Sequence, residues 1–407
     1  MKNVRRAAAA VLAAVMVLVL PATAGLAEPP VQTEGITIPT FRMKQFRIPD
    51  TEAFDMVRDM KAGWNLGNAF DAYDGYSLFV GGTQLESRWC GAVTTRELLQ
   101  AVRDAGFNAV RIPVSWHNHV DASGRIDPAW MDRVREVADW ALEMDLYVIV
   151  NVHHDNDPSC YYPDSAHYEA SAAWLAGVWK QMAEAFRDAG ERLILESMNE
   201  PRLTGTPYEW YWDPEVPECL DAADCINRLN QLFVDTVRGT GGNNATRYLA
   251  VPAYDASAWY ACSDAFVLPE DPAGDRLILS AHAYSPYSFT FDENHEDNAF
   301  DPDRDMEKKR EIFVIMDTLY ERFVSRGVPV LIDEFGAQEK SGNLQARVNY
   351  AAYYSAAASA HGITCFWWDN NVFSGNGERF GLIDRQKVRW VFPDIALALA
   401  ENCTTGR

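Results

Sequence analysis

Two glutamates in this sequence each follow an apolar run that has the character of a buried strand. An apolar run that begins at Leu193 ends in Asn199-Glu200. Pro201 stops it, because proline cannot donate a hydrogen bond to a sheet. Residues 328–332 form a second apolar run, which ends in Asp333-Glu334. A lone glutamate in a loop is usually only a solvated side chain. Two carboxyl groups facing each other across a cleft, however, are the minimal equipment for cleaving a glycosidic bond.

Strand-like and helix-like segments alternate around these two runs. Asp127 is a good N-cap and Pro128 suits the first helical position, so 127–144 is the clearest helix. Eight strands are expected at 63–68, 107–116, 146–152, 193–200, 248–254, 277–281, 328–336 and 363–368, and helices at 94–105, 127–144, 171–189, 221–238, 306–326, 345–361 and 394–402. Repeated βα units predict parallel strands with right-handed crossovers.

Eight such units predict an α/β protein, a (β/α)8 TIM barrel, with a single catalytic domain over residues 51–407. The alternative is a doubly wound open sheet, which usually has a glycine-rich phosphate loop after its first strand. Here the corresponding turn, residues 68–71, reads Asn-Ala-Phe-Asp and offers no phosphate cradle.

Polar residues gather at the carboxyl ends of the expected strands, where a barrel carries its active site. They are Asn68, Arg111, His153, Asn199, Glu200, His282, Tyr284, Glu334 and Trp368. Random placement would put such residues at both ends of the strands, so the pattern predicts one shared site.

These residue types suit a glycosidase. Arg111 and Tyr284 could donate hydrogen bonds to Glu334, and the positive charge of Arg111 would keep that carboxylate ionised. His282 could orient Glu200, and the amide of Asn199 could hold a sugar 2-hydroxyl. A retaining enzyme needs one carboxyl as proton donor and one as nucleophile, with different pKa values.

The chain resembles glycoside hydrolase family 5, the cellulase family, over nearly its whole length after residue 51. The resemblance is carried by the motifs at 63–68 (GWNLGN), 111, 153–154 (HH), 193–202 (ending NEPR), 282–284 (HAY), 334–336 (EFG) and 367–370 (WWDN). It implies that Glu200 is the acid/base and Glu334 the nucleophile of a double displacement. It also implies supporting roles for Asn68, Arg111, His153, His154, Asn199, His282, Tyr284 and Trp368. No metal or organic cofactor is expected, and the motif forms are similar to the endoglucanase and xyloglucanase branch.

Strand alternation limits which neighbours can share the site, because successive side chains point to opposite faces. We expect Trp368 rather than Trp367 to face the sugar. On the same argument His153 and His154 make a poor metal chelate, and one of them should serve packing.

The other polar residues near the strand ends have plainer roles. Glu196 should point the same way as Glu200 but deeper in the barrel, as a structural carboxylate. Asp333 should point away from Glu334 and is the weaker nucleophile candidate. His117 and His119 should line or flank the cleft. Loop tryptophans can stack on pyranose rings or pack in the core: Trp89, Trp210, Trp212 and Trp259.

The first 27 residues read as a secretory signal peptide. Lys2, Arg5 and Arg6 precede an apolar run, and the small-residue stretch 22–27 predicts cleavage after Ala24 or Ala27. A transmembrane anchor is the alternative, but the run is short for one. Residues 28–50 contain four prolines and predict an extended arm or linker. We expect a secreted, soluble protein without a membrane partner.

The formal net charge is −22, or about −25 without the three positive charges of the signal. Such a charge disfavours nucleic acid as a partner, because binding to it depends on Lys and Arg neutralising phosphates. A neutral β-glucan is not repelled. We expect the chain to act on it as a monomer.

Seven cysteines in an exported chain leave at least one unpaired. The hypothesis at this stage is one to three disulfides, with Cys219 and Cys225 as a local pair and Cys365 as a buried thiol.

The leading function is a secreted retaining endo-β-1,4-glucanase. The nearest alternative is the same chemistry on xyloglucan, mixed-linkage β-glucan or mannan. A non-catalytic polysaccharide-binding protein should have lost one of the two glutamates, and a Schiff-base aldolase needs a lysine at a strand end, which is lacking. A metal-dependent barrel hydrolase needs His-x-His on an early strand, but His117-Asn118-His119 follows the strand end.

Overall fold

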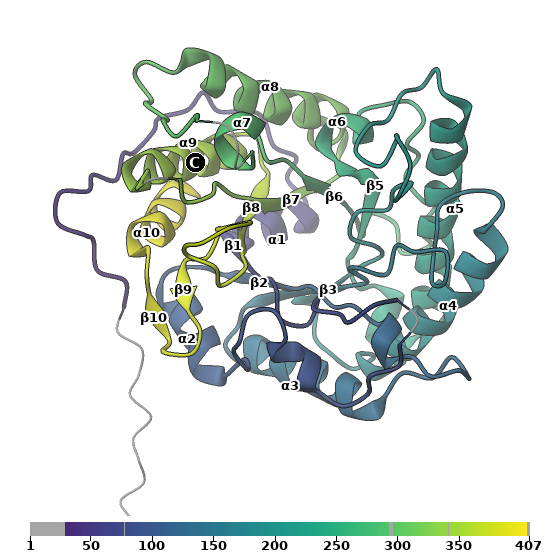
Figure 1. Cartoon of the computed structure of the whole chain (residues 1–407). Coiled ribbons are helices and arrows are strands. Elements are labelled where there is room, and N and C mark those ends of the chain that lie inside the picture. The colour runs from purple at the N-terminus through teal and green to yellow at the C-terminus, as the bar shows by residue number, and fades with distance from the viewer. Residues whose placement is uncertain (1–28, 77, 293–295, 341, 405–407) are drawn as a thin grey trace, which may run out of the picture.

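The computed structural model describes residues 29–76, 78–292, 296–340 and 342–404. The predicted signal peptide therefore lies outside the described residues. Eight parallel strands form a closed barrel in sequence order, because β1 pairs with both β2 and β8 (Figure 1). They are β1 (Gly63–Leu66), β2 (Ala109–Ile112), β3 (Tyr147–Asn151), β4 (Leu193–Glu196), β5 (Leu249–Ser257), β6 (Leu277–His282), β7 (Val330–Phe335) and β8 (Thr364–Asp369). The predicted (β/α)8 barrel is confirmed.

Helices surround the barrel and connect its strands, as Figure 1 shows. They are α2 (Arg96–Asp104), α3 (Pro128–Glu143), α4 (Tyr168–Ala185), α5 (Pro217–Gly239), α6 (Ala258–Ala261), α7 (Tyr287–Thr290), α8 (Met306–Arg322), α9 (Leu344–Ala360) and α10 (Pro393–Asn402). The predicted cap of α3 is present, since Asp127 accepts from the backbone N–H of Ala129 at 3.0 Å. At α2 the cap is Thr95, which accepts from Leu98 N.

Several features differ from the expectation. A helix before the barrel, α1 (Glu52–Met60), and a short hairpin of β9 (Ile383–Asp384) and β10 (Arg389–Trp390) were not predicted. Strand β2 ends at Ile112, directly before Pro113, rather than reaching residue 116. Helix α5 begins at Pro217, which occupies its first turn, rather than at residue 221.

The lower interior of the barrel is filled by apolar side chains that point inward from the strands. They form one cluster with the buried face of α1, and include Ala109, Ile149, Ile194, Ala250, Ile278, Leu331 and Phe366. A side chain at Gly63 would collide with the ring of Phe366, since an added Cβ would lie only 2.0 Å from it. This packed layer shows which residues of each strand point into the barrel. Side chains alternate between the two faces of a strand, so the polar residues two positions further along point into the barrel as well.

Residues 29–50 run as an extended segment along the outside of the barrel, past α9 and α10 (Figure 1). Thr33 donates to the buried carboxylate of Asp394 on α10 at 2.6 Å. The ring of Phe46 stacks on His361, with centroids 4.0 Å apart. In the part of the chain that the structure describes, no helix is long and apolar enough to cross a membrane.

All seven cysteines lie in the described residues, and all are free thiols. The disulfide hypothesis is therefore wrong for this structure. Cys219 and Cys225 both lie on α5, where six positions turn the helix through about 240°, so their side chains leave it in different directions. Cys365 is a buried thiol, as expected.

Candidate active site

The two glutamates come together at the carboxyl ends of the strands. Glu200 lies four residues beyond the end of β4, and Glu334 lies in β7. One carboxylate oxygen of each, together with a ring nitrogen of His282, lies within 4.8 Å of the others. The side chain of Glu334 is 7% exposed and that of Glu200 is 19% exposed, so both open onto the surface from an otherwise buried cluster.

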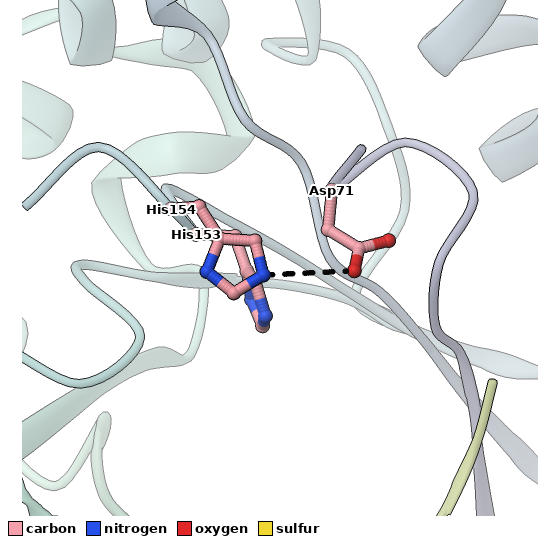
Figure 2. Close-up of side chains that lie close together, drawn as sticks. All are labelled: Asp71, His153 and His154. Carbon is pink, nitrogen blue, oxygen red and sulfur yellow. Dashed lines mark ion pairs between the residues drawn. The ribbon is translucent and has the colours of Figure 1, made fainter. Parts of the chain in front are cut away.

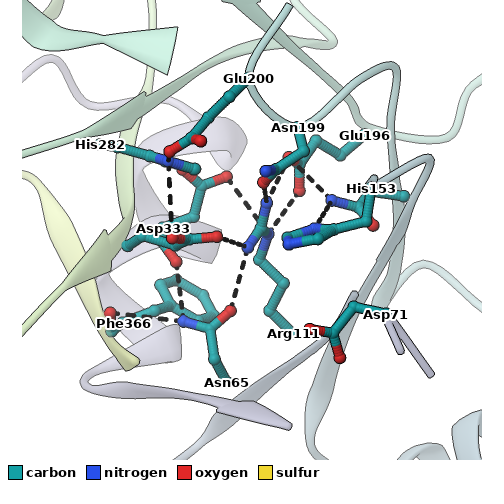
Figure 3. Close-up of polar contacts among 12 residues, drawn as sticks. Asn65, Asp71, Arg111, His153, Glu196, Asn199, Glu200, His282, Asp333 and Phe366 are labelled. Carbon is teal, nitrogen blue, oxygen red and sulfur yellow. Dashed lines mark hydrogen bonds and ion pairs between the residues drawn. The ribbon is translucent and has the colours of Figure 1, made fainter. Parts of the chain in front are cut away.

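Arg111 lies at the centre of the polar contacts drawn in Figure 3. It rises from β2, is fully buried, and forms a two-pronged ion pair with Glu196 at 2.7 and 2.8 Å. Its Nη1 donates to Glu334 Oε1 at 2.6 Å. Burial alone would lower the pKa of Arg111, but the negative charges of Glu196, Glu334 and Asp333 hold it well above the ordinary value. The guanidinium is therefore a permanent positive charge under Glu334.

The same guanidinium fixes the amide of Asn199. Arg111 Nη2 donates to Asn199 Oδ1 at 2.7 Å, so the amide nitrogen of Asn199 is left as a donor.

Asn151 orients the ring of His153, because the amide of Asn151 is itself fixed by a hydrogen bond to its oxygen. Its oxygen accepts from Val114 N, so its NH2 group faces His153 Nδ1 at 3.1 Å. His153 therefore carries its proton on Nε2, and the side chains of Asn199 and His153 both present hydrogen-bond donors, as sugar hydroxyls require.

His282 bridges the two glutamates. Its Nδ1 lies 2.7 Å from Glu200 Oε1 and 3.6 Å from Glu334 Oε2. Burial would lower the pKa of His282, but the negative charges of Glu334 and Glu200 outweigh it and raise the pKa to about 9. Burial would raise the pKa of Glu200, but the hydrogen bond and charge of His282 lower it to about 2. Burial raises the pKa of Glu334 against the lowering effect of His282 and Arg111. These opposite pKa shifts favour a protonated His282 beside an ionised Glu200 at neutral pH.

Tyr284 and Trp368 complete the surroundings of the pair. The hydroxyl of Tyr284, two residues after β6, donates to Glu334 Oε2 at 3.0 Å. The indole of Trp368 lies parallel to the His153 ring, with centroids 5.8 Å apart. Trp367 points the other way, where its Nε1 donates to Phe380 O and its ring packs on Phe335. The placement of Trp368 on the site side agrees with strand alternation.

The expected orientation of Asp333 is wrong. Leu331 points into the barrel, so Asp333 follows the inward phase and comes within 3.9 Å of Arg111 Nε. Glu334 would then point outward, but β7 contains a bulge: Ala281 pairs with Ile332, and His282 pairs with Glu334. The extra residue turns Glu334 inward as well, and bulges commonly re-aim side chains beside active sites. Both carboxylates of the Asp-Glu pair therefore face the interior.

The expected separation of His153 and His154 is also wrong. Strand β3 ends at Asn151, so alternation does not govern the two histidines, and their ring centroids lie 4.4 Å apart. Figure 2 shows both beside Asp71, whose Oδ2 is 3.8 Å from His154 Nε2. Burial raises the pKa of Asp71 to about 7 and lowers that of His154 to about 4.

This trio has donor atoms close enough for a metal ion, since one from each residue lies within 4.8 Å of the others. The hydrogen bond from Asn151 leaves His153 with a protonated Nε2, which suits a hydrogen-bond donor better than a metal ligand. In a second such group, formed by Glu196, His282 and Asp333, the guanidinium of Arg111 already supplies the positive charge.

Comparison with known proteins decides the family. The family model Cellulase (glycosyl hydrolase family 5) matches residues 70–374. The chain belongs to glycosyl hydrolase family 5. Endoglucanase A of Ruminococcus albus is 38% identical over 358 residues, which cover 87% of this chain and 94% of that protein. The chain is therefore a glycoside hydrolase.

Solved structures of the family agree with the fold. A family 5 lichenase from a Caldicellulosiruptor species is 48% identical, with a TM-score of 0.88 over 90% of this chain and all of that one, and a mutant of it was solved with cellotetraose. A broad-specificity endoglucanase from Ruminococcus champanellensis with bound cellotriose is 37% identical, with a TM-score of 0.79 over 87% of this chain and all of that one.

Some of the predicted residues of this family 5 enzyme stand outside the glutamate network. Asn68 has a left-handed backbone with φ of 60°, and its N–H donates to Asp71 Oδ2. His117 Nδ1 lies at hydrogen-bond distance, 2.8 Å, from Asp155 Oδ1, and His119 stacks on Trp130 at 3.8 Å, so His117-Asn118-His119 does not converge on one point.

The loop tryptophans fall into two groups. Trp212 is buried and donates to Cys219 O, which is a packing role. Three others expose their rings: Trp89, Trp210 and Trp259. Trp210 lies over the guanidinium of Arg202 at 4.0 Å, and Arg202 in turn contacts Glu200 Oε2 at 3.3 Å. An aromatic platform is thus linked to one of the two glutamates.

Sequence reasoning missed two asparagines that position the network. Asn65 accepts from Arg111 at 3.1 Å and donates to Asp333 O at 2.8 Å. Asn151 holds His153, as described above. Both lie two positions beyond a residue that points into the barrel, so their side chains point inward too, but this spacing becomes a signal only once the interior residues are known.

Proposed function

We propose that this family 5 enzyme is a retaining endo-β-1,4-glucanase in which Glu200 is the acid/base and Glu334 the nucleophile. The observation that carries the proposal is that one carboxylate oxygen of Glu200 lies within 4.8 Å of one carboxylate oxygen of Glu334. Retaining glycosidases hold their carboxyl groups about 5–5.5 Å apart, whereas inverting enzymes leave about 6.5–9.5 Å for a water molecule.

In the first step Glu334 attacks the anomeric carbon, and the leaving oxygen takes a proton from Glu200. Arg111 and Tyr284 each donate to one oxygen of Glu334, which holds the carboxylate ionised and fixes its direction of attack. Asn199 is placed to donate to a sugar hydroxyl beside the nucleophile. In the second step Glu200 takes a proton from water, and that water releases the sugar from Glu334.

Glu200 must be protonated to act as an acid, yet its carboxylate is ionised while His282 holds the proton. The hydrogen bond between His282 Nδ1 and Glu200 Oε1 is 2.7 Å long, so the proton can cross it directly. The group of Glu200, His282 and Glu334 therefore contains the single proton that the first step consumes. Substrate binding excludes water from Glu200 and favours its neutral form.

The substrate class follows from the named relatives and from the aromatic rings at the site. Solved neighbours of this chain bind cellotetraose and cellotriose, and one is named a lichenase. Trp368 beside His153 offers a flat apolar surface for a pyranose ring, and exposed Trp210 offers a second near Glu200. We propose β-1,4-linked glucan as the substrate, with mixed-linkage β-glucan, xyloglucan and mannan as the alternatives.

A panel of soluble polysaccharides tests this substrate assignment. Carboxymethylcellulose, barley β-glucan, xyloglucan and glucomannan should be compared at equal mass by reducing-end release and by the fall in viscosity. An endo-acting enzyme lowers viscosity early, before many reducing ends appear. The proposal is wrong if the purified enzyme cuts none of the four.

The variant Glu334→Gln separates catalysis from binding. Turnover should be lost, while cello-oligosaccharide binding measured by calorimetry should remain, because the amide keeps the shape of the carboxylate. A polysaccharide-binding protein without catalysis would show no difference between variant and parent. Full activity of the variant would overturn the role of Glu334. Activity should also survive a chelator, since no step uses a metal.

Secretion is a proposal that rests on residues 1–27, which carry the signal-type pattern. N-terminal sequencing of protein recovered from a culture medium should begin after Ala24 or Ala27. An intact Met1 would contradict it. We also propose a monomer, and light scattering of the purified protein should give the mass of one chain.

A further inference from the structure

The two ring nitrogens of His282 face two different carboxylates, as Figure 3 shows. Nδ1 is 2.7 Å from Glu200 Oε1, and Nε2 is 3.6 Å from Asp333 Oδ1. The Nε2 atom of His282 and both carboxylate oxygens of Asp333 are buried and make no hydrogen bond of normal geometry among the described residues, although the Ser280 hydroxyl lies close enough to Asp333 to lower its pKa. Unpaired buried polar atoms are costly, so a donor and an acceptor that face each other at this distance call for an explanation.

The bulge in β7 explains how Asp333 and Glu334 both come to face the interior. Asp333 lies on the same inward face as Leu331, and the extra residue turns Glu334 inward beside it. Without the bulge, either Asp333 or Glu334 would face inward, but not both. The local backbone thus places a second acid behind His282.

We propose that Asp333 is a positioning residue whose carboxylate accepts from His282 Nε2–H and so completes an Asp333–His282–Glu200 relay. The inference rests on the proposed role of Glu200 as the proton donor. A small rotation of the ring closes the 3.6 Å gap to hydrogen-bond length. Asp333 then fixes the ring so that Nδ1–H points at Glu200.

The proton balance of the relay is simple. In the first step the Nδ1–H bond of the imidazolium breaks and an O–H bond forms on Glu200, which passes the proton to the leaving oxygen. Neutral His282 keeps its proton on Nε2, where Asp333 accepts the hydrogen bond. After Glu200 has taken a proton from water in the second step, it returns that proton to Nδ1, and the starting state is restored.

The charges around His282 decide whether Asp333 raises or lowers the pKa of His282. Glu334, Glu200 and Asp333 act directly on His282, and the charge of His282 acts in turn on Asp255 of β5 and on His153 after β3. Other groups act on the carboxylates beside His282: Glu196, Arg111 and Ser280 on Asp333, Arg202 and His154 on Glu200, and Tyr284 on Glu334. Burial and the charge of Glu196 raise the pKa of Asp333 to about 7, so it carries negative charge on the alkaline side of neutrality. That charge helps to keep His282 protonated at alkaline pH.

The test is the pH dependence of kcat/KM for Asp333→Asn in the full-length enzyme. Loss of the carboxylate should move the alkaline limb about one pH unit lower, which is about a tenfold loss at a fixed pH on that limb. The matched control is Asp71→Asn, another fully buried aspartate with a pKa raised to about 7 that does not face His282 Nε2. Its alkaline limb should stay where the parent enzyme has it.

A second readout follows His282 directly. In protein labelled with 15N-histidine, the resonances that His282→Gln removes report this ring, and their titration midpoint should fall in Asp333→Asn but not in Asp71→Asn. Should Asp333→Asn not fold, as judged by thermal melting, Asp333→Ser carries the same expectation.

The outcomes separate the two proposals. An active parent with an unchanged alkaline limb and unchanged His282 titration in Asp333→Asn overturns the relay and leaves the catalytic assignment intact. Equal shifts in both aspartate variants also overturn it, because a general charge effect would then suffice. A parent enzyme that cleaves no polysaccharide overturns the proposed function, and the His282 titration still reports whether Asp333 holds the ring.

Discussion

Arg111 Nη1 donates to Glu334 Oε1 at 2.6 Å, and this contact ties the carboxylate of Glu334 to a fully buried side chain of β2. The other guanidinium nitrogens of Arg111 bind Glu196 and Asn199. Nη1 also donates to Asn65, so one planar group with donors in a fixed fork sets the positions of four side chains, which a single ammonium cannot do.

Arg111→Lys should therefore keep the positive charge but lose the simultaneous hydrogen bonds to Glu334, Glu196 and Asn199. The activity kcat/KM should fall by about a hundredfold, as expected when reacting groups are misplaced by about 1 Å. The acidic limb of the pH profile should move upward, because Glu334 loses its close donor and protonates more readily. Steady-state kinetics across pH on a soluble β-glucan measures both. An unchanged acidic limb would show that Arg111 does not hold Glu334 ionised.

Glu200→Ala separates the roles of the two glutamates. Cleavage of polysaccharide should fall by about 10²–10⁴-fold, the usual contribution of a positioned general acid. Aryl glycosides with good leaving groups should keep a fast first step, because they need little protonation, and should show a burst of the released phenol. The burst is measured by stopped-flow absorbance. Equal losses on both kinds of substrate would remove Glu200 from the role of acid.

Tyr284→Phe deletes a single hydroxyl that donates to Glu334 Oε2 at 3.0 Å. A hydrogen bond to a charged group contributes about 1.5–3 kcal/mol, so kcat/KM should fall by about 10- to 100-fold. The melting temperature should change little, because the ring is retained. Parallel kinetics and thermal melts measure the two effects. Unaltered kcat/KM would show that the hydroxyl does not act on the nucleophile.

His119 makes the fold sensitive to acid. Burial lowers the pKa of His119 to about 3, against the opposing charge of Asp127, and its ring stacks on Trp130. Between about pH 6.5 and 3 the unfolded chain binds a proton here that the folded chain does not, so this part of the stability is lost as pH falls through that window. In His119→Phe the phenyl ring can still stack on Trp130, but it carries no group that takes up a proton.

The melting temperature of His119→Phe relative to the parent enzyme should therefore rise as the pH is lowered from 7 to 4. Differential scanning calorimetry at several pH values measures this difference. A constant difference across the range would show that His119 does not titrate on unfolding.

The barrel could be predicted from the sequence, and so could the meeting of Glu200 and Glu334 at one end of it, because both depend on local patterns. Apolar runs mark the strands, but two of them end earlier than expected: β2 ends at Ile112, directly before Pro113, and β4 ends at Glu196, four residues before Glu200. The bulge that turns Glu334 inward could not be predicted, since it depends on the register between β6 and β7. The contact between His153 and His154 was missed for a related reason: β3 ends two residues before the first of them.

Packing across the fold explains the other differences. Helix α1 is short, and its apolar face is explained only by the open end of the barrel that it covers. Cys219 and Cys225 have spacing typical of a local bridge in a loop, but they lie within a helix. Asn65 and Asn151 have no distinctive spacing until the interior layer of the barrel is known.

The most direct measurement traps the covalent intermediate. The enzyme is incubated with an activated 2-deoxy-2-fluoro-cellobioside, which forms the glycosyl-enzyme but hydrolyses it slowly, and the labelled peptide is sequenced by tandem mass spectrometry. The label should lie on Glu334, and the neighbouring Asp333 should be unmodified. A label on Asp333 or Glu200, or the absence of a covalent adduct in an enzyme that cleaves the unfluorinated glycoside, would contradict the assignment.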